Sequence, residues 1–165
     1  MKKKIILTLF TLSFFLITFF SCTKEVAKLL GPNDSQLFGM AADSNHRFYY
    51  QNDSTVFLSP QGGSPHGTFK LRFNAAAKNA LGGDGKLAVQ GEFPDSSLIT
   101  KVMYSGPQGS IVGYAVMFKL NKAWFRAEYG PTGVIYTGIT GDISSCLSCH
   151  QGPNNRDQIL TFFYH

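Results

Sequence analysis

The sequence predicts an α+β fold, in which a predominantly antiparallel β-sheet is accompanied by a few short helices. The main observation is a series of short stretches rich in β-branched and aromatic residues, a composition typical of strands. The later stretches are separated by turn-sized gaps such as Gly106–Gly109 and Gly130–Gly133, and consecutive strands with such gaps usually pair antiparallel. The predicted strands cover residues 68–73, 98–104, 111–120, 124–129 and 134–136.

The stretch 68–73 shows the alternation expected of a strand with one buried face. Phe69, Leu71 and Phe73 share one face, whereas Lys70 and Arg72 share the other. Side chains alternate between the two faces of a strand, so this pattern indicates an apolar face that packs on a core.

Three short helices are predicted beside the sheet. Asn74 is a good N-cap for an alanine-rich helix over 75–81, which Gly82 ends. Asp142 is a good N-cap for a second helix that ends before Gly152. A third helix is expected over 156–163. The C-terminal part is thus predicted to be helical and the middle part to be a sheet.

The N-terminus has the pattern of an export signal. Lys2–Lys4 form a positive segment, and the apolar run Ile5–Phe20 is 16 residues long, shorter than the roughly 20 residues of a membrane-spanning helix. Ser21 and Cys22 then resemble a bacterial lipobox, although Phe19 stands where an aliphatic residue is usual. We therefore expect residues 1–21 to be a lipoprotein signal peptide and Cys22 to be lipidated, with ordinary signal cleavage as the alternative.

Composition after the signal indicates one domain. Residues 22–36 are polar and predict a flexible tether, and residues 37–165 have a suitable length for a single folded domain. Three of the 15 Lys and Arg residues lie in the signal, which leaves 12 against 10 Asp and Glu, or about +2. No basic stripe remains, so the sequence gives no support for nucleic-acid binding.

The most specific motif is Cys146-Leu147-Ser148-Cys149-His150. A Cys-x-x-Cys-His run is the signature of c-type haem attachment. Its two thiols can each add to one vinyl group, and His150 can ligate the iron through its imidazole. A redox dithiol or a zinc site fits less well, because the local pattern is not a βαβ unit and no second ligand pair is present.

Haem attachment also agrees with export. We expect one covalent haem c in a protein on the periplasmic side of the bacterial cell envelope, held to a membrane by its lipid anchor. The sequence does not name the protein that exchanges electrons with it.

The sixth coordination position of the iron is left open by the sequence. Phe69 and Phe73 could form an apolar wall around an open position that admits small neutral ligands such as NO or CO. Arg72 and Glu128 are weak candidates for catalytic residues within that pocket. Alternatively, a side chain fills the position, the candidates being Met40, Met103, Met117, His46 and His66.

Several segments resemble the cytochrome P-460 and cytochrome c′-beta family. The resemblance runs from about His46 to the C-terminus. It is carried by Pro65-His66-Gly67, Arg72-Phe73-Asn74, Phe93-Pro94-Asp95-Ser96-Ser97, Trp124–Tyr129, the Cys-x-x-Cys-His motif and Arg156–Leu160. It implies an antiparallel sheet with helices, often a homodimer, and a five-coordinate high-spin haem held by His150.

The family has two functional branches. Cytochromes P-460 oxidise hydroxylamine and carry a lysine–haem cross-link, for which Lys70, Lys86 and Lys101 are candidates in this chain. The c′-beta members lack the cross-link and bind NO or CO behind phenylalanines. Because of Phe69 and Phe73, we expect ligand binding with redox cycling rather than catalysis. Hydroxylamine or NO oxidation is the alternative, and electron transfer by a six-coordinate haem is a third.

Overall fold

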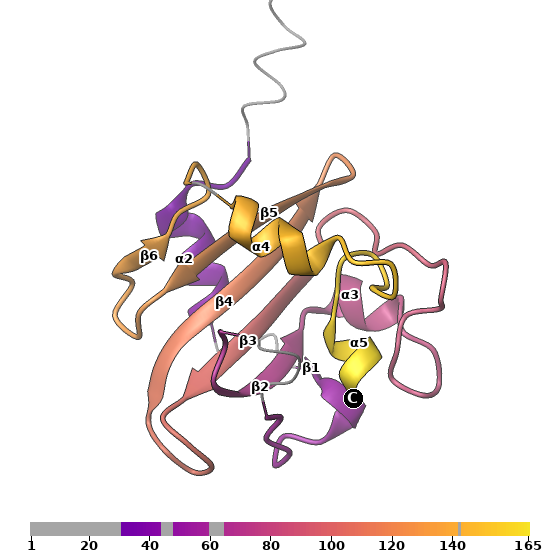
Figure 1. Cartoon of the computed structure of the whole chain (residues 1–165), viewed down its shortest axis with the longest axis horizontal. Helices are drawn as coiled ribbons and strands as arrows, with labels where there is room; N and C mark the ends of the chain where they lie inside the picture. Colours follow the sequence, from indigo (N-terminus) through magenta and orange to yellow (C-terminus); the bar gives the residue numbers. More distant parts are fainter. Residues whose placement is uncertain (1–30, 44–47, 60–64, 142) are drawn as a thin grey trace, which may run out of the picture. The chain divides into compact units, whose positions relative to one another are not determined.

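The fold consists of a six-stranded antiparallel sheet with short helices packed beside it (Figure 1). The computed structural model describes residues 31–43, 48–59, 65–141 and 143–165. The predictions for the signal peptide 1–21, for Cys22, His46 and the Asp142 N-cap lie outside the described residues. From Asn33 onward, the chain forms one unit.

Strand order in the sheet follows the chain from β1 to β6, and every neighbouring pair is antiparallel. This arrangement confirms the predicted fold class. The strands are β1 (Phe48–Tyr49), β2 (Thr68–Phe73), β3 (Leu98–Tyr104), β4 (Ile111–Leu120), β5 (Ala123–Tyr129) and β6 (Ile135–Thr137).

The helices are short. They are α2 (Asp34–Ala42), the 3₁₀ turn η1 (Tyr50–Asn52), α3 (Ala75–Asn79), α4 (Ser144–His150) and α5 (Thr161–Tyr164). A capping box starts α2, because Asn33 and Gln36 each accept a hydrogen bond from the other's backbone N–H. The helix therefore includes residues 34–36, which the sequence assigned to the tether. No helix within the described ranges has the length and apolarity to cross a membrane.

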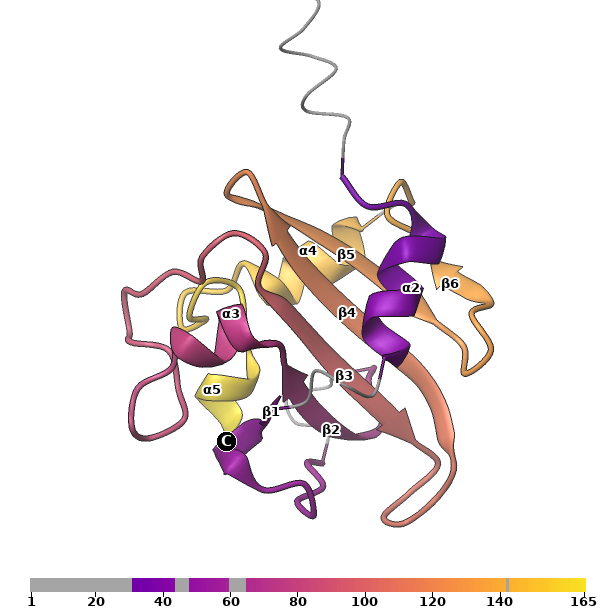
Figure 2. The same cartoon turned by 180° about the vertical axis from the view of Figure 1, so that it is seen from behind.

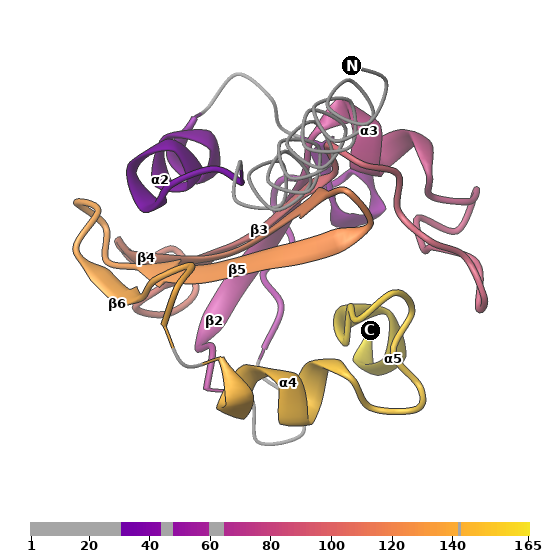
Figure 3. The same cartoon turned by 90° about the horizontal axis from the view of Figure 1, so that it is seen from above.

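The two faces of the sheet bury separate apolar clusters, with helices on both sides (Figures 2 and 3). On one face, Leu37 and Ala41 of α2 pack against Val102, Val116 and Tyr129. On the other face, Ile159 and Phe162 of the C-terminal segment pack with side chains of strands β2 to β5. The alternation of side chains along each strand supplies both clusters from the same sheet.

The predicted helix over 156–163 is wrong in its first half. Arg156 and Ile159 form an antiparallel bridge, and only Thr161–Tyr164 is helical. Between them, Asp157 and Gln158 have φ values of 46° and 68°, which interrupt a right-handed helix. The side chain of Asp157 accepts hydrogen bonds from three donors outside the segment, and these tertiary contacts override the local helix preference.

Replacement of Asn74 tests how α3 is fixed to the sheet. Its Oδ1 accepts hydrogen bonds from the backbone N–H groups of Ala77 and Leu98, both at 3.0 Å. Asn74→Ala removes a helix cap and a sheet contact together, so we expect a loss of about 2 kcal/mol in the free energy of unfolding. The exposed cap variant Asn33→Ala should cost about 1 kcal/mol. Urea denaturation of both variants measures the difference, and equal losses would contradict the dual role of Asn74.

Candidate functional site

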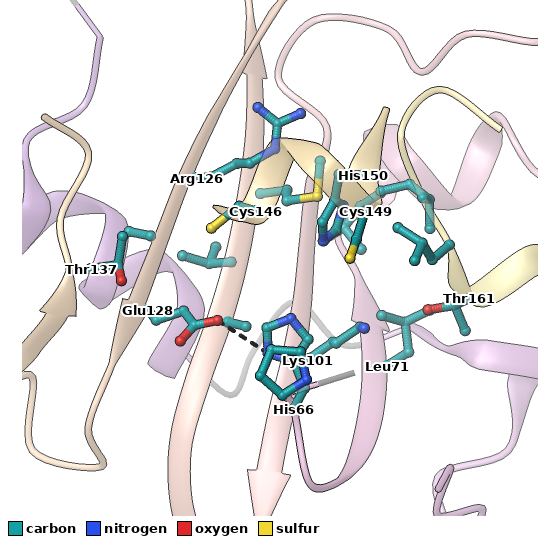
Figure 4. A pocket seen from close by; sticks show the side chains of 18 of the residues that line it. His66, Leu71, Lys101, Arg126, Glu128, Thr137, Cys146, Cys149, His150 and Thr161 are labelled. Atoms are coloured by element: carbon teal, nitrogen blue, oxygen red, sulfur yellow. Dashed lines mark ion pairs between the residues drawn. The ribbon is translucent and has the colours of Figure 1, made fainter. Parts of the chain in front are cut away.

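Helix α4 presents both thiols and the histidine of the motif to one cavity (Figure 4). Cys146 and Cys149 are three residues apart, and His150 is four residues after Cys146, so the helix brings all three to neighbouring positions on its surface. Both thiols are free in the described part of the chain. The sequence spacing and the helical geometry thus place two nucleophiles and one metal ligand around the same space.

His150 is held in a defined orientation. Its Nδ1 lies 2.7 Å from the carbonyl oxygen of Gln158, and a carbonyl can only accept, so Nδ1 carries the proton. The other ring nitrogen, Nε2, then has the lone pair that a metal ligand requires. Burial lowers the pKa of His150 to about 4, against the opposing effect of this hydrogen bond, and the imidazole is therefore neutral at physiological pH.

The cavity has a volume of about 300 Å³, within the range of small-molecule and cofactor sites. One side is formed by α4 and the C-terminal segment, and the other by the sheet. Much of its surface is apolar, through Leu71, Ile99, Met117 and Ile159. An apolar cleft that also contains two thiols and a neutral imidazole fits the chemistry of a covalently bound haem.

One row of paired residues on the sheet side of the cavity crosses five strands. The row is Leu71, Lys101, Ala115, Glu128 and Thr137, each paired with the next across neighbouring strands, and all five line the cavity. Paired residues on antiparallel strands point to the same face. The small side chain of Ala115 leaves space between the lysine and the carboxylate.

Lys101 is half-buried in this row. Its Nζ lies 4.6 Å from the centre of the Phe69 ring, a cation–π contact. Desolvation lowers the pKa of Lys101 to about 8, although the nearby Glu128 carboxylate opposes the shift. The cavity therefore contains an amine with a larger neutral fraction at pH 7 than an exposed lysine has.

The other two candidate lysines lie elsewhere. The Nζ of Lys70 donates to the carbonyl of Ser54 at 2.6 Å and lies 4.2 Å from the centre of the Phe57 ring. Lys86 lies in the loop after α3 and is not among the residues that line the cavity. Of the three lysines named from the sequence, the structure brings Lys101 to the motif.

His66 and Glu128 form a polar pair in the cavity, with His66 Nδ1 at 3.1 Å from Glu128 Oε1. Burial, aided by the positive charge of Lys101, lowers the pKa of His66 to about 3. The ring is therefore neutral at pH 7, so the contact is not a pair of opposite charges. Desolvation raises the pKa of Glu128, against the effect of Lys101.

Phe69, Phe73 and Arg72, which the sequence suggested for the pocket, do not line the cavity. Phe69 and Phe73 share the cavity's face of the sheet but belong to rows on either side of Leu71, and neither lines the cavity. Phe73 instead stacks on Phe162, with ring centres 6.3 Å apart. Arg72 points to the opposite face, where it donates to the carbonyl of Ala41. Glu128 is the predicted catalytic candidate that reaches the cavity.

The candidate sixth ligands are also separated by the fold. Met117 and His66 line the cavity, whereas Met103 packs against the apolar core. Met40 belongs to α2, on the opposite face of the sheet, and is 38 % exposed. Of the candidate sixth ligands within the described residues, Met117 and His66 therefore reach the cavity.

Two residues with clear roles in the site were missed from the sequence. Ala115 sets the space in the row, and the only signal is a small residue among large ones in a predicted strand. Gln158 holds His150 through its backbone carbonyl. Every residue has such a carbonyl, so the residue type at this position gives no signal for the contact. Comparisons with models of known families, with curated proteins and with solved structures find no match for this chain.

Filling the centre of the row tests the role of the cavity. In Ala115→Leu, the larger side chain occupies the space between Lys101 and Glu128, so we expect the haem predicted from the motif to be incorporated poorly. The cost in folding should stay below about 3 kcal/mol, the usual range for overpacking. Haem content per protein, measured by absorption after co-expression with a c-type haem assembly system, checks this expectation. The control is Ala123→Leu at the exposed start of β5, and full haem content in Ala115→Leu would contradict the assignment.

Proposed function

We propose that this chain is a mono-haem c-type cytochrome whose haem occupies the cavity between α4 and the sheet. The observation that carries the proposal is the convergence of Cys146, Cys149 and His150 on one cavity, with His150 Nδ1 bonded to Gln158. Bound haem supplies an iron that takes up small ligands and changes between ferric and ferrous states.

The residues of α4 have distinct roles in this proposal. Each thiol would add across one vinyl group, which would form a carbon–sulfur bond and move the thiol proton to the neighbouring carbon without net oxidation. His150 Nε2 would hold the iron, because its lone pair faces the cavity. The hydrogen bond from Nδ1 to Gln158 fixes the tautomer and the plane of the ring, as second-shell partners of metal-bound histidines usually do.

On the sheet side, Lys101, Glu128 and His66 surround the remaining space. Lys101 can donate a hydrogen bond or a proton to a small polar ligand and the Glu128 carboxylate can accept one, whereas the apolar residues around them keep bulk water away. The proposed ligand class is a nitrogen oxide or another diatomic molecule. The phenylalanine wall expected from the sequence is thus replaced by a wall that combines apolar and protic groups.

Export and lipid anchoring through Cys22 remain predictions from the sequence, as does a homodimer. They agree with the proposed cofactor, since c-type haem is attached outside the cytoplasm. The redox partner is a protein of the same compartment in this proposal.

Cysteine variants test the proposed cofactor. After co-expression with a c-type haem assembly system, the intact mass should increase by one haem that remains bound after acid–acetone extraction. Cys146→Ser and Cys149→Ser should each retain a single thioether bond or lose the haem. Cys22→Ser is the matched control and should carry the full covalent haem. Haem that acid–acetone removes from the unaltered protein would overturn the proposal.

A second function is favoured by the presence of Lys101 and Glu128 in one row of the cavity. Oxidation of hydroxylamine or NO would use a lysine bonded to the haem and a carboxylate that accepts protons. Formation of the carbon–nitrogen bond removes one hydrogen from Nζ and one from the porphyrin, so it needs a two-electron oxidant. The lowered pKa of Lys101 favours the neutral amine that such a bond requires.

Peptide mass spectrometry separates the two functions. If the protein is an enzyme of this kind, a haem peptide will contain Lys101 in addition to Cys146 and Cys149, and Lys101→Arg will abolish it. Lys70→Arg is the control, because Lys70 contacts Phe57 and Ser54 outside the cavity. Haem peptides that contain only the two cysteines would exclude the cross-linked enzyme and leave ligand binding.

A further inference from the structure

The turn that holds His150 has an unfavourable backbone. Asp157 and Gln158 both have positive φ, at 46° and 68°, between the bridged residues Arg156 and Ile159. Successive positive φ values are typical of the two central residues of tight hairpin turns, where glycine and asparagine are preferred. A side chain other than glycine costs about 1 kcal/mol or more in this region. The surrounding structure must therefore stabilise the turn.

Asp157 provides that stabilisation through its carboxylate. Oδ2 accepts hydrogen bonds from the backbone N–H of Phe93 and from Lys119 Nζ, both at 2.8 Å. Oδ1 accepts a hydrogen bond from the indole Nε1–H of Trp124 at 3.0 Å. Lys119 and Trp124 belong to β4 and β5 and are only 3 % and 9 % exposed. Charge-assisted hydrogen bonds in such a shielded place are strong and directional.

Gln158, the next residue in the turn, contacts His150 directly. The backbone carbonyl of Gln158 accepts from His150 Nδ1 at 2.7 Å, and its side-chain oxygen accepts from Arg126 of β5. Arg126 also donates to the carbonyl of Trp124 at 3.3 Å. The sheet is thus connected to the imidazole through two consecutive residues of one turn.

We propose that Asp157 is a positioning residue for His150, which sets the hydrogen bond from Nδ1 to the Gln158 carbonyl by fixing the turn to Lys119 and Trp124. The inference rests on the proposed function, because it assigns the electronic effect of this bond to a haem iron. A strong bond to Nδ1–H makes the imidazole more basic and favours the ferric state. A loosened turn weakens that bond and therefore favours the ferrous state.

Two variants loosen the turn in different ways. Asp157→Asn keeps the size of the side chain, but an NH2 group replaces one of the two acceptor oxygens. The substitution therefore loses either the bond from Trp124 or the two bonds from Phe93 and Lys119. Trp124→Phe keeps an aromatic ring against Phe93, whose centre lies 5.9 Å from that of Trp124. It removes the Nε1–H donor and leaves the Asp157 carboxylate unchanged. It serves as the second test if Asp157→Asn does not fold.

The readouts are the reduction potential of the covalent haem and the iron–histidine stretching band in resonance Raman spectra of the ferrous protein. We expect a more positive potential and a lower stretching frequency in both variants, with the smaller change in Trp124→Phe. The matched control is Asp34→Asn. Asp34 accepts hydrogen bonds from the Tyr129 hydroxyl and from the backbone N–H of Ile139, both at 3.0 Å. The Asp34→Asn variant should therefore be less stable, with an unchanged reduction potential and an unchanged stretching band.

The outcomes distinguish this inference from the proposed function. An unaltered protein without covalent haem would overturn both. Covalent haem with an unchanged potential and an unchanged band in Trp124→Phe and Asp157→Asn would overturn the inference alone. Equal shifts in Asp34→Asn would also overturn it, because they would show a general response to lost stability.

Discussion

The hydrogen bond from His150 Nδ1 to the Gln158 carbonyl is the contact on which the candidate site depends. It decides which ring nitrogen faces the cavity and joins α4 to the C-terminal segment. That segment is in turn fixed to the sheet by Asp157. Without this chain of contacts, a helix of seven residues with no fully buried side chain would have little to orient it, since short helices gain most of their stability from packing.

The second constraint is the register of the sheet. Because each pair of neighbouring strands is antiparallel and in a fixed register, residues far apart in the sequence form one row across the cavity. A shift of one residue in any strand would exchange the two faces and replace the cavity's lining in that strand. The cavity's mixture of apolar and ionisable groups is therefore a property of the whole sheet, and the lowered pKa values of Lys101 and His66 follow from their burial in it.

Local patterns in the sequence were sufficient for strands β2 to β6 and for the motif helix, whereas the two-residue strand β1 was not predicted. Alternation along 68–73 and the turn-sized gaps between later strands depend on neighbouring residues, and so does the spacing of Cys146, Cys149 and His150. The lining of the cavity depends on register, so Phe69 and Phe73 could not be separated from Leu71 by their pattern. The helix predicted over 156–163 failed for the same reason, because distant donors to Asp157 fix its backbone.

Absorption spectra of the haem-loaded protein, oxidised and reduced, with and without CO and NO, test the central claim most directly. If His150 holds the iron of a haem in this cavity and room for a small ligand remains, the spectrum will be high-spin and will shift on addition of either gas. A low-spin spectrum that neither gas changes would contradict the claim, and would show that a side chain such as Met117 or His66 fills the sixth position.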